Sequence, residues 1–270
     1  MAQPTRLQRI QLKSPREIQL MREAGKVVSE ALGLVREQAK PGVTTAELDA
    51  TVAGVFKRHG AESLFKNYPS PTKGVAPFPA VVCSSVNEVI VHGIPNRRPL
   101  QEGDVVSIDT GCRLNGWCGD SAVTLPIGAI RPELQKLLDV TKQTLDLAIQ
   151  AMATCRYWSE VADMMEKHVK GHGFSVIEKF VGHGIGRQMH EDPQVPNFVN
   201  AALKRNDIRL EPGTVLAIEP MVALGTKNVS ILGDGWTVVT KDGRAAAHFE
   251  HTVAMTPDGP RILTLPPDQP

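Results

Sequence analysis

Two aspartates lie in a segment, residues 105–125, that is otherwise largely apolar and β-branched. An Asn-Gly pair at 115–116 is the strongest two-residue signal for a β-hairpin, so we expect Asp109 to face Ala122 across it. Asp120 lies two residues from Ala122 and therefore shares its face of the sheet. Unpaired carboxylates there repel each other and resist desolvation, and a bound cation would remove both costs. From the hairpin alone, one turn-flanking and one solvated aspartate is the open alternative.

A second segment repeats this pattern further along the chain. Leu100–Asp109 and Leu210–Glu219 are similar in sequence, and each ends in a carboxylate. This likeness indicates an internal duplication. The next acid expected on a strand is Glu250, and a histidine stands among glycines in residues 182–186, where the backbone can bring an imidazole close. The candidate ligands are thus Asp109, Asp120, His183, Glu219 and Glu250.

This set of side chains favours a pair of metal ions. Four carboxylates and one neutral imidazole carry a charge of −4, which two divalent cations would balance. Oxygen-rich sites with one nitrogen suit catalytic Mn²⁺, Fe²⁺, Co²⁺ or Zn²⁺ better than a structural Zn²⁺, which prefers Cys and His. Two ions ~3.5–4 Å apart can activate a water and clamp the tetrahedral intermediate of an acyl transfer. Rival signatures, such as H-E-x-x-H, G-x-S-x-G or a P-loop, are absent from the sequence.

Composition limits the remaining possibilities. The 270 residues are 41% hydrophobic and 22% charged, with a net charge of +1 and 4% aromatic residues. This balance argues against specific nucleic-acid binding, which needs a basic surface or stacking platforms. The apolar runs are too short for a membrane span or a secretory signal. The four cysteines form no C-x-x-C pair, so we expect reduced thiols and a cytoplasmic protein.

The elements that must position these residues follow from caps, breakers and periodicity. Capping signals and apolar spacing predict helices over 15–38, 132–152 and 159–169, and a further helix that is capped by Thr44 or Thr45 and ends at 59. Besides the hairpin at 105–125, a strand or a second hairpin is expected at 80–91. Strands are expected at 174–181, 214–222, 236–240 and 249–255, with a tight turn at 182–186. Two helices followed by strands thus occur twice, in halves of about 15–130 and 131–264. We expect the antiparallel sheets of the two halves to meet across a pseudo-twofold axis, with the helices outside. Residues 1–14 are expected to be a leader and 265–270 a tail.

Several motifs together resemble a known family. They are His92-Gly93-Ile94-Pro95, Ile108-Asp109 with Gly119-Asp120-Ser121, residues 182–193 (G-H-G-I-G-R-x-x-H-E-x-P), residues 218–221 (I-E-P-M) and residues 250–252 (E-H-T). In this order they resemble the type I methionine aminopeptidases, over about residues 15–264. The resemblance implies the α/β pita-bread fold as one catalytic domain, enclosing a dinuclear metal site. It also implies removal of the initiator methionine from nascent polypeptides whose second residue is small.

The resemblance further implies roles for single residues. Asp109 would chelate one ion with both oxygens, Asp120 and Glu250 would bridge the two ions, and His183 and Glu219 would complete the set. Glu219 would also pass the proton of the attacking water. His190 would hydrogen-bond the substrate amide or the developing oxyanion, and His92 would contact the scissile nitrogen or steady the intermediate. The methionine pocket would be lined by Phe78, Cys83, Met189 and Trp236.

The sequence departs from the family pattern in the segment before Cys83. Residues 66–79 are longer and richer in proline than usual, and Met189 replaces a more usual aromatic residue in the pocket wall. Two alternatives stay open: a proline-specific exopeptidase on the same fold, and a non-catalytic binding protein of that fold. A monomer is expected, and the identity of the metal, ribosome contact and tolerance at the second substrate position cannot be read from the sequence.

Overall fold

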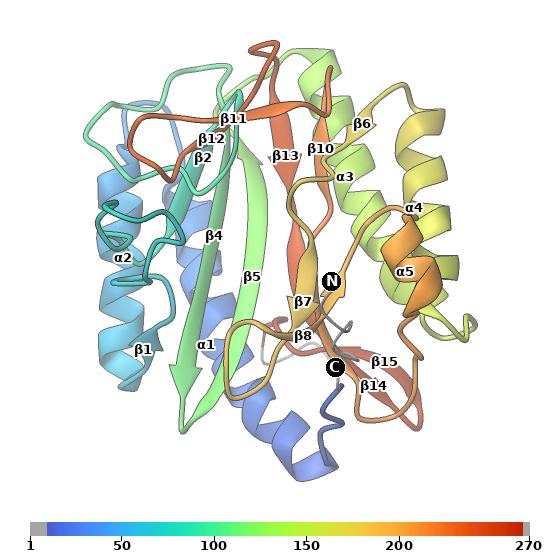
Figure 1. The fold of residues 1–270 in the computed structure, drawn as a ribbon. Helices are drawn as coiled ribbons and strands as arrows, with labels where there is room; N and C mark the ends of the chain where they lie inside the picture. Colours follow the sequence, from blue (N-terminus) through green and yellow to red (C-terminus); the bar gives the residue numbers. More distant parts are fainter. Residues whose placement is uncertain (1–9, 267–270) are drawn as a thin grey trace.

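The computed structural model describes residues 10–266, and within this range four long helices and a short one accompany the strands (Figure 1). The helices are α1 Pro15–Gln38, α2 Thr45–His59, α3 Pro132–Ala151, α4 Trp158–Gly171 and α5 Ala201–Arg205. The strands are β1 Glu62–Ser63, β2 Cys83–Val86, β3 Val89–Val91, β4 Val105–Leu114, β5 Trp117–Pro126, β6 Ser175–Val176, β7 Gly182–Gly184, β8 Glu191–Val195, β9 Val215–Ile218, β10 Met221–Ala223, β11 Val229–Ile231, β12 Val238–Thr240, β13 Ala246–His248, β14 Glu250–Thr256 and β15 Gly259–Ile262.

The first two helices begin where their capping residues predict. Ser14 accepts a hydrogen bond from the backbone N–H of Glu17, and Thr44 does the same for Glu47, each as part of a capping box. α2 ends at Gly60, which takes the left-handed conformation with φ of 63°. These local signals confirm the expected helices over 15–38 and 45–59.

The largest sheet among the described residues joins both halves of the chain. Its order is β1-β4-β5-β14-β9-β7-β8, with β2 also paired to β4 and β15 to β14, and every pairing is antiparallel. The sheet is pseudo-symmetric about the β5–β14 contact: β5 corresponds to β14, β4 to β9, and β2 to β7. The expected pseudo-symmetric antiparallel sheets are therefore present and merge into one.

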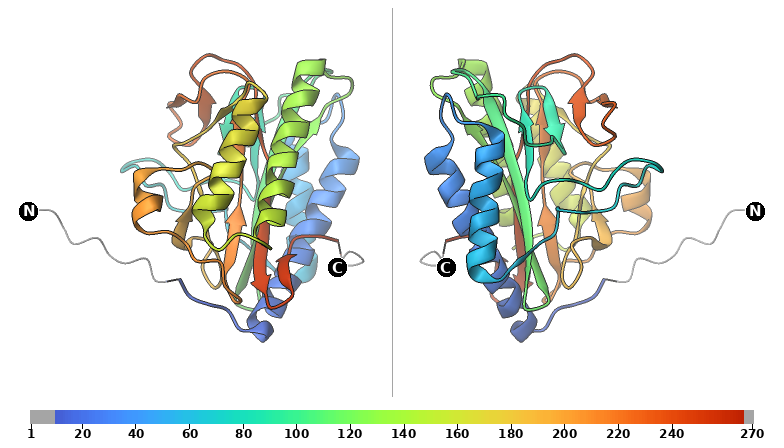
Figure 2. Two further views of the ribbon diagram at one scale, coloured as in Figure 1. Left: turned by 90° about the vertical axis from the view of Figure 1, so that its right-hand side faces the viewer. Right: turned by 90° about the vertical axis from the view of Figure 1, so that its left-hand side faces the viewer.

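The two faces of this sheet have different surroundings. Figure 2 shows α1, α2 and α3 on one side and the segment around residues 66–79 on the other. On β4, Val106 and Ile108 belong to the core that the helices cover, while Asp109 points to the opposite face. α1 comes so close to β5 that a Cβ on Gly119 would lie 2.8 Å from the backbone nitrogen of Gly25. The helices therefore support the sheet from behind and leave its other face open for a site.

Several strands of the second half differ from the sequence expectation. The predicted strand 174–181 is reduced to Ser175–Val176, and the predicted turn 182–186 begins with strand β7. The predicted strand 214–222 is interrupted after Ile218, and 249–255 begins one residue later, at Glu250. Pro220 explains one interruption, because proline has no N–H for the ladder. The glycines of β7 fit because a Cβ on Gly182 or Gly184 would collide with backbone atoms of the neighbouring strands.

The two ends of the described chain are held by long-range contacts. The backbone N–H of Lys13 donates to the Gly213 carbonyl at 2.7 Å. Arg22 on α1 donates to the carbonyls of Leu265 and Pro266. Residues 1–9 of the expected leader and 267–270 of the expected tail lie outside the described residues, so the domain boundaries stay predictions. No helix in residues 10–266 combines the length and apolarity that crossing a bilayer requires.

Candidate metal centre

Strand register brings the five predicted ligands to one face of the sheet. Asp109 pairs with Ala122, as the Asn-Gly turn predicts, and Ala122 pairs in turn with Glu250. Asp120 lies two residues from Ala122 and so shares this face. On the far side of β14, His183 pairs with Ala217, and Glu219, two residues on, stands just beyond the end of β9. Residues from four strands and one strand end thus converge.

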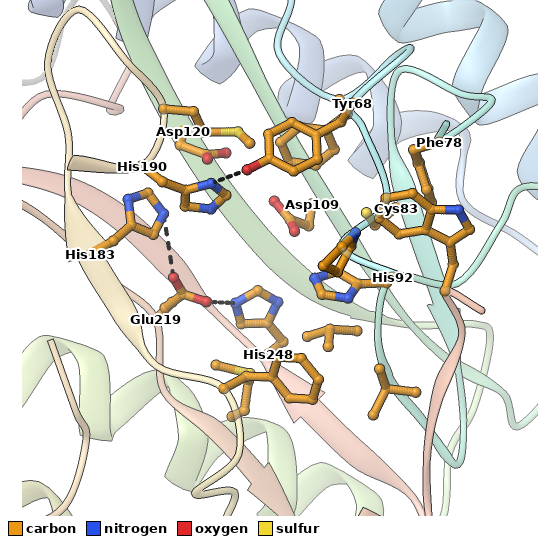
Figure 3. A pocket seen from close by; sticks show the side chains of 18 of the residues that line it. Tyr68, Phe78, Cys83, His92, Asp109, Asp120, His183, His190, Glu219 and His248 are labelled. Carbon is orange, nitrogen blue, oxygen red and sulfur yellow. Dashed lines mark hydrogen bonds and ion pairs between the residues drawn. The ribbon is translucent and has the colours of Figure 1, made fainter. Parts of the chain in front are cut away.

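The ligand atoms of three of these residues are already within reach of one ion. Asp120, His183 and Glu250 are buried, and one ligand atom from each lies within 4.8 Å of the others. Glu219 adjoins them, with its Oε1 3.6 Å from His183 Nε2. Asp109 lies outside this close group, but its side chain points into the same pocket, beside that of Asp120 (Figure 3). The candidate ligands thus form one compact cluster of three residues, and the carboxylates of Glu219 and Asp109 lie beside it.

Three carboxylates of this site hold an oxygen without a hydrogen-bond partner among the described residues. They are Asp109 Oδ1, Asp120 Oδ1 and Glu250 Oε1, all buried. A buried carboxylate oxygen without a donor is costly unless a cation satisfies it. A donor set of carboxylate oxygens and one imidazole nitrogen also suits divalent transition-metal ions. The residues present therefore fit a metal centre.

Burial and mutual repulsion favour the neutral form of each candidate ligand. Burial, reinforced by repulsion from neighbouring carboxylates, raises the pKa of Asp109, Glu219 and Glu250 well above the ordinary range. Burial raises the pKa of Asp120 to about 7, opposed by a backbone hydrogen bond from Ser121. Burial lowers the pKa of His183 to about 3, so its imidazole is neutral and free to act as a ligand. The site is thus suited to bind positive charge.

Three further histidines face the same space and are also neutral. Burial lowers the pKa of His92 and His248 to about 4 and about 3, and lowers that of His190 as well. His190 Nδ1 lies 2.8 Å from the Tyr68 hydroxyl, and His248 Nε2 lies 3.7 Å from Glu219 Oε2. Figure 3 shows both contacts around the carboxylates. Neutral imidazoles can donate a hydrogen bond to a substrate without adding a buried charge.

One cavity of about 280 Å³ contains all of these groups. The side of the cavity away from the carboxylates is apolar, where the rings of Phe78 and Trp236 meet edge to face at 5.3 Å. Of the residues predicted from the sequence, every one borders this cavity: Phe78, Cys83, His92, Asp109, Asp120, His183, Met189, His190, Glu219, Trp236 and Glu250. A polar floor and an apolar wall are therefore available to one small substrate group.

The structure adds lining residues that the sequence did not reveal. Tyr68, Phe65 and Phe180 border the cavity, and so does His248, the last residue of β13. A signal for His248 was present, since it lies two residues before Glu250 and so could share its face. Tyr68 belongs to the proline-rich segment 66–79, whose Pro71 and Thr72 also border the cavity. Trp236 Nε1 donates to the carbonyl of Ala76 at 3.0 Å, so this segment supports the apolar wall.

Comparison with known proteins is consistent with this geometry. The model of the family "Metallopeptidase family M24" matches residues 19–257. The methionine aminopeptidase of Clostridium perfringens is 45% identical over 254 residues, which are 94% of this chain and 98% of that relative. Methionine aminopeptidase 1 of Bacillus subtilis is 44% identical, over 93% of this chain and 98% of its own length.

Solved structures agree and confirm the pita-bread fold. The methionine aminopeptidase of Thermotoga maritima superposes with a TM-score of 0.88 at 39% identity, over 95% of this chain and 100% of that one. The prolidase of Pyrococcus furiosus has a TM-score of 0.71 at 20% identity, over 94% of this chain and 65% of that one, and shows the fold alone. With a cluster of side chains at the cavity that could hold a metal ion, the chain belongs to the methionine aminopeptidases, hydrolases of metallopeptidase family M24.

Proposed function

We propose that this enzyme removes the N-terminal methionine from nascent polypeptides and peptides whose second residue is small. The observation that carries the proposal is one cavity in which four carboxylates, those of Asp120 and Glu250 fully buried, and a neutral histidine face an apolar wall. The acids suit metal-assisted hydrolysis of an amide, and the wall suits one unbranched side chain. The free α-amine of the substrate would coordinate a metal ion, which would restrict the reaction to chain ends.

The proposed site holds two divalent ions, from among Mn²⁺, Fe²⁺, Co²⁺ and Zn²⁺. Asp109 would bind one ion with both oxygens, and Asp120 and Glu250 would be shared between the two. His183 and Glu219, 3.6 Å apart, would complete the set. Such ions lower the pKa of a bound water and polarise the scissile carbonyl. With four carboxylates, two dications would leave the site neutral, which offsets the burial and the mutual repulsion that raise the carboxylate pKa values.

Glu219 is the residue proposed to carry the proton. It stands at the end of β9, between His183 and His248, and burial raises its pKa well above the usual range. A carboxylate beside the attacking water would accept its proton and return it to the leaving amine. The neighbouring histidines are neutral and have lowered pKa values, so they do not compete with Glu219 for that proton.

His190 and His92 are proposed to bind the reacting amide. When the Tyr68 hydroxyl donates to His190 Nδ1 at 2.8 Å, the proton of the imidazole lies on Nε2 and can be donated to the substrate carbonyl. His92, with a lowered pKa of about 4, is neutral and available to the scissile nitrogen. The two rings thus lie at the cavity with donors for the oxyanion and the leaving group.

The apolar wall is proposed to bind the methionine side chain. Phe78, Cys83, Met189 and Trp236 are buried and border the cavity. A thioether is flexible and polarisable and packs well against aromatic rings. We also propose that the enzyme acts as a cytoplasmic monomer, in keeping with the free thiols of Cys83, Cys112, Cys118 and Cys155.

The two alternative functions have less support. A proline-specific exopeptidase would share the metal ligands. However, the prolidase of known structure is 20% identical in sequence to this chain, whereas a methionine aminopeptidase is 45% identical. A non-catalytic binding protein is disfavoured because buried carboxylate oxygens without partners are costly to keep without a cation.

Turnover of Met-Ala-Ser and Ala-Pro peptides separates these functions. Protein stripped with a chelator is assayed with and without added Mn²⁺ or Co²⁺. We expect release of methionine from Met-Ala-Ser with metal only, and no cleavage of Ala-Pro. Cleavage of Ala-Pro instead would favour the exopeptidase, and binding of either peptide without turnover at any metal concentration would overturn the proposed activity.

A further inference from the structure

The turn that carries Met189 and His190 into the cavity is closed by the carboxylate of Glu191. Glu191 Oε1 accepts hydrogen bonds from the backbone N–H groups of Arg187, at 2.8 Å, and Gln188, at 3.1 Å. This carboxylate therefore satisfies the backbone of the residues immediately before Met189. Its geometry determines where the next two side chains enter the site.

The other oxygen of Glu191 is held by a lysine from the opposite end of the chain. Lys13 Nζ lies 2.6 Å from Glu191 Oε2 and 2.9 Å from the carbonyl of Gln11. The two side chains are 7% and 14% exposed, so the ion pair is largely removed from water. The lysine stem passes over Gly186, where a Cβ would lie 2.5 Å from Lys13 Cε. Because Lys13 N–H also bonds Gly213, the lysine backbone is fixed to the sheet.

A buried ion pair of this kind is more important for position than for stability. Removing one partner leaves the other charge buried and unpaired, which is strongly unfavourable. Without Lys13, the carboxylate of Glu191 would turn toward water and release the N–H groups of Arg187 and Gln188. The backbone of His190 would then shift and draw its ring away from the Tyr68 hydroxyl, 2.8 Å from Nδ1 in the intact protein.

We propose that Lys13 is a positioning residue, which acts through Glu191 to hold the His190 turn in its reactive place. The proposal rests on the proposed role of His190 in binding the scissile amide. It links the segment before α1 to the substrate side of the cavity. It also assigns a function to a lysine that lies outside the cavity lining.

A double-mutant cycle tests the link through kinetics. Lys13→Met should lower kcat for Met-Ala-Ser by about tenfold or more with little change in KM, since small displacements of a positioned group are costly. Glu191→Gln keeps an acceptor for the two N–H groups and should have a smaller effect. In the double variant no charge is left unpaired, so kcat should recover toward the Glu191→Gln value. Additive losses in the double variant would overturn the proposal.

Lys26→Met is the matched control. Lys26 also pairs with a glutamate, Glu23, at 2.8 Å, but the pair is half exposed on α1, so kcat should stay unchanged. Should Lys13→Met fail to fold, Lys13→Gln removes the charge while keeping a donor of similar reach. It is then expected to show the same loss of kcat and the same recovery with Glu191→Gln, and a wild-type kcat would contradict the proposal.

A spectroscopic measurement separates failure of this inference from failure of the proposed function. In Zn²⁺-supplemented, ¹⁵N-histidine-labelled protein, the Nδ1 resonance of His190 is assigned with His190→Asn. Tyr68→Phe gives its position when the hydroxyl contact is lost. Lys13→Met should move the resonance toward the Tyr68→Phe position, whatever the substrate proves to be. An unchanged resonance in folded Lys13→Met protein would refute the positioning role even if methionine release is confirmed.

Discussion

The two halves of the sheet present matching carboxylates in different backbone settings. Asp109 lies in the middle of β4, with partners on both sides, Cys83 and Ala122. Glu219 matches it in the repeat but follows the last residue of β9 and precedes Pro220, where the ladder stops. The first carboxylate is therefore fixed by a continuous sheet, whereas the second is a longer side chain at a strand end.

Their side-chain partners differ in the same way. Asp109 Oδ1 has no hydrogen-bond partner among the described residues, while Glu219 lies between His183 and His248, at 3.6 and 3.7 Å. A fixed carboxylate with an unsatisfied oxygen suits a permanent ligand. A carboxylate at a strand end between neutral imidazoles suits a group that must also exchange protons. The duplication thus supplied two similar acids, and the break at Pro220 allows them to differ in role.

Loss of the fixed carboxylate should have the largest effect. Asp109→Ala is expected to lower kcat/KM for Met-Ala-Ser by at least about a thousandfold, because metal-ion catalysis contributes several kcal/mol. The bound metal, measured by elemental analysis, should fall in parallel. His59→Ala is the control, since His59 pairs with Glu30 at the surface, and activity surviving in Asp109→Ala would contradict the ligand assignment.

Removing the charge of Glu219 should test its proposed role in proton transfer. Glu219→Gln is expected to lower kcat by about a hundredfold or more, the usual scale of general acid–base catalysis. Substrate binding, followed as KM, should change much less. A normal kcat in this variant would show that the strand-end carboxylate carries no proton and would leave the two halves equivalent.

His248 contacts the carboxylate of the second half, so its loss should sharpen the difference between halves. We expect His248→Gln to lower kcat by about tenfold, as for other groups that orient a metal ligand. The pH dependence of kcat should shift as well, because the surroundings of Glu219 change. Should metal affinity fall as far as in Asp109→Ala, His248 would belong to the ligand set instead.

The pH dependence of stability tests the electrostatics of the metal-stripped protein. Burial raises the pKa of Asp120 from 3.8 to about 7. Its contribution to stability is therefore fully present below pH 3.8 and is lost as the pH rises through about 7. His183 and His248, with pKa values lowered to about 3, act in the opposite sense and lose stability as the pH falls from 6.5.

Comparing Asp120→Asn with the parent protein isolates the carboxylate from these histidines. In urea titrations the free energy of unfolding of the variant should rise relative to that of the parent by about 1 kcal/mol per pH unit between roughly pH 4 and 7. The reason is that residue 120 has no proton to lose in the variant. Added Mn²⁺ should reverse the order by stabilising only the parent. A difference that does not vary with pH would mean that Asp120 is ionised at low pH despite its burial.

Much of the first half could be predicted from local sequence. The capping boxes at Ser14 and Thr44 and the Asn-Gly turn each determine structure within a few residues. The turn alone therefore placed Asp109 opposite Ala122. The second half was less predictable, because β6 and β7 are only two and three residues long. Such short strands form through their neighbours and leave a weak pattern in the sequence.

The sequence by itself determined which residue types are available for chemistry, where the long helices begin, and how the hairpin is registered, because these depend on contacts between near neighbours. The tertiary structure alone decided that β5 pairs with β14 and β9 with β14. It also brought Tyr68 to His190, His248 to Glu219 and Lys13 to Glu191. These contacts join residues far apart in the chain, and they form only when the whole apolar face of the sheet is buried under its helices.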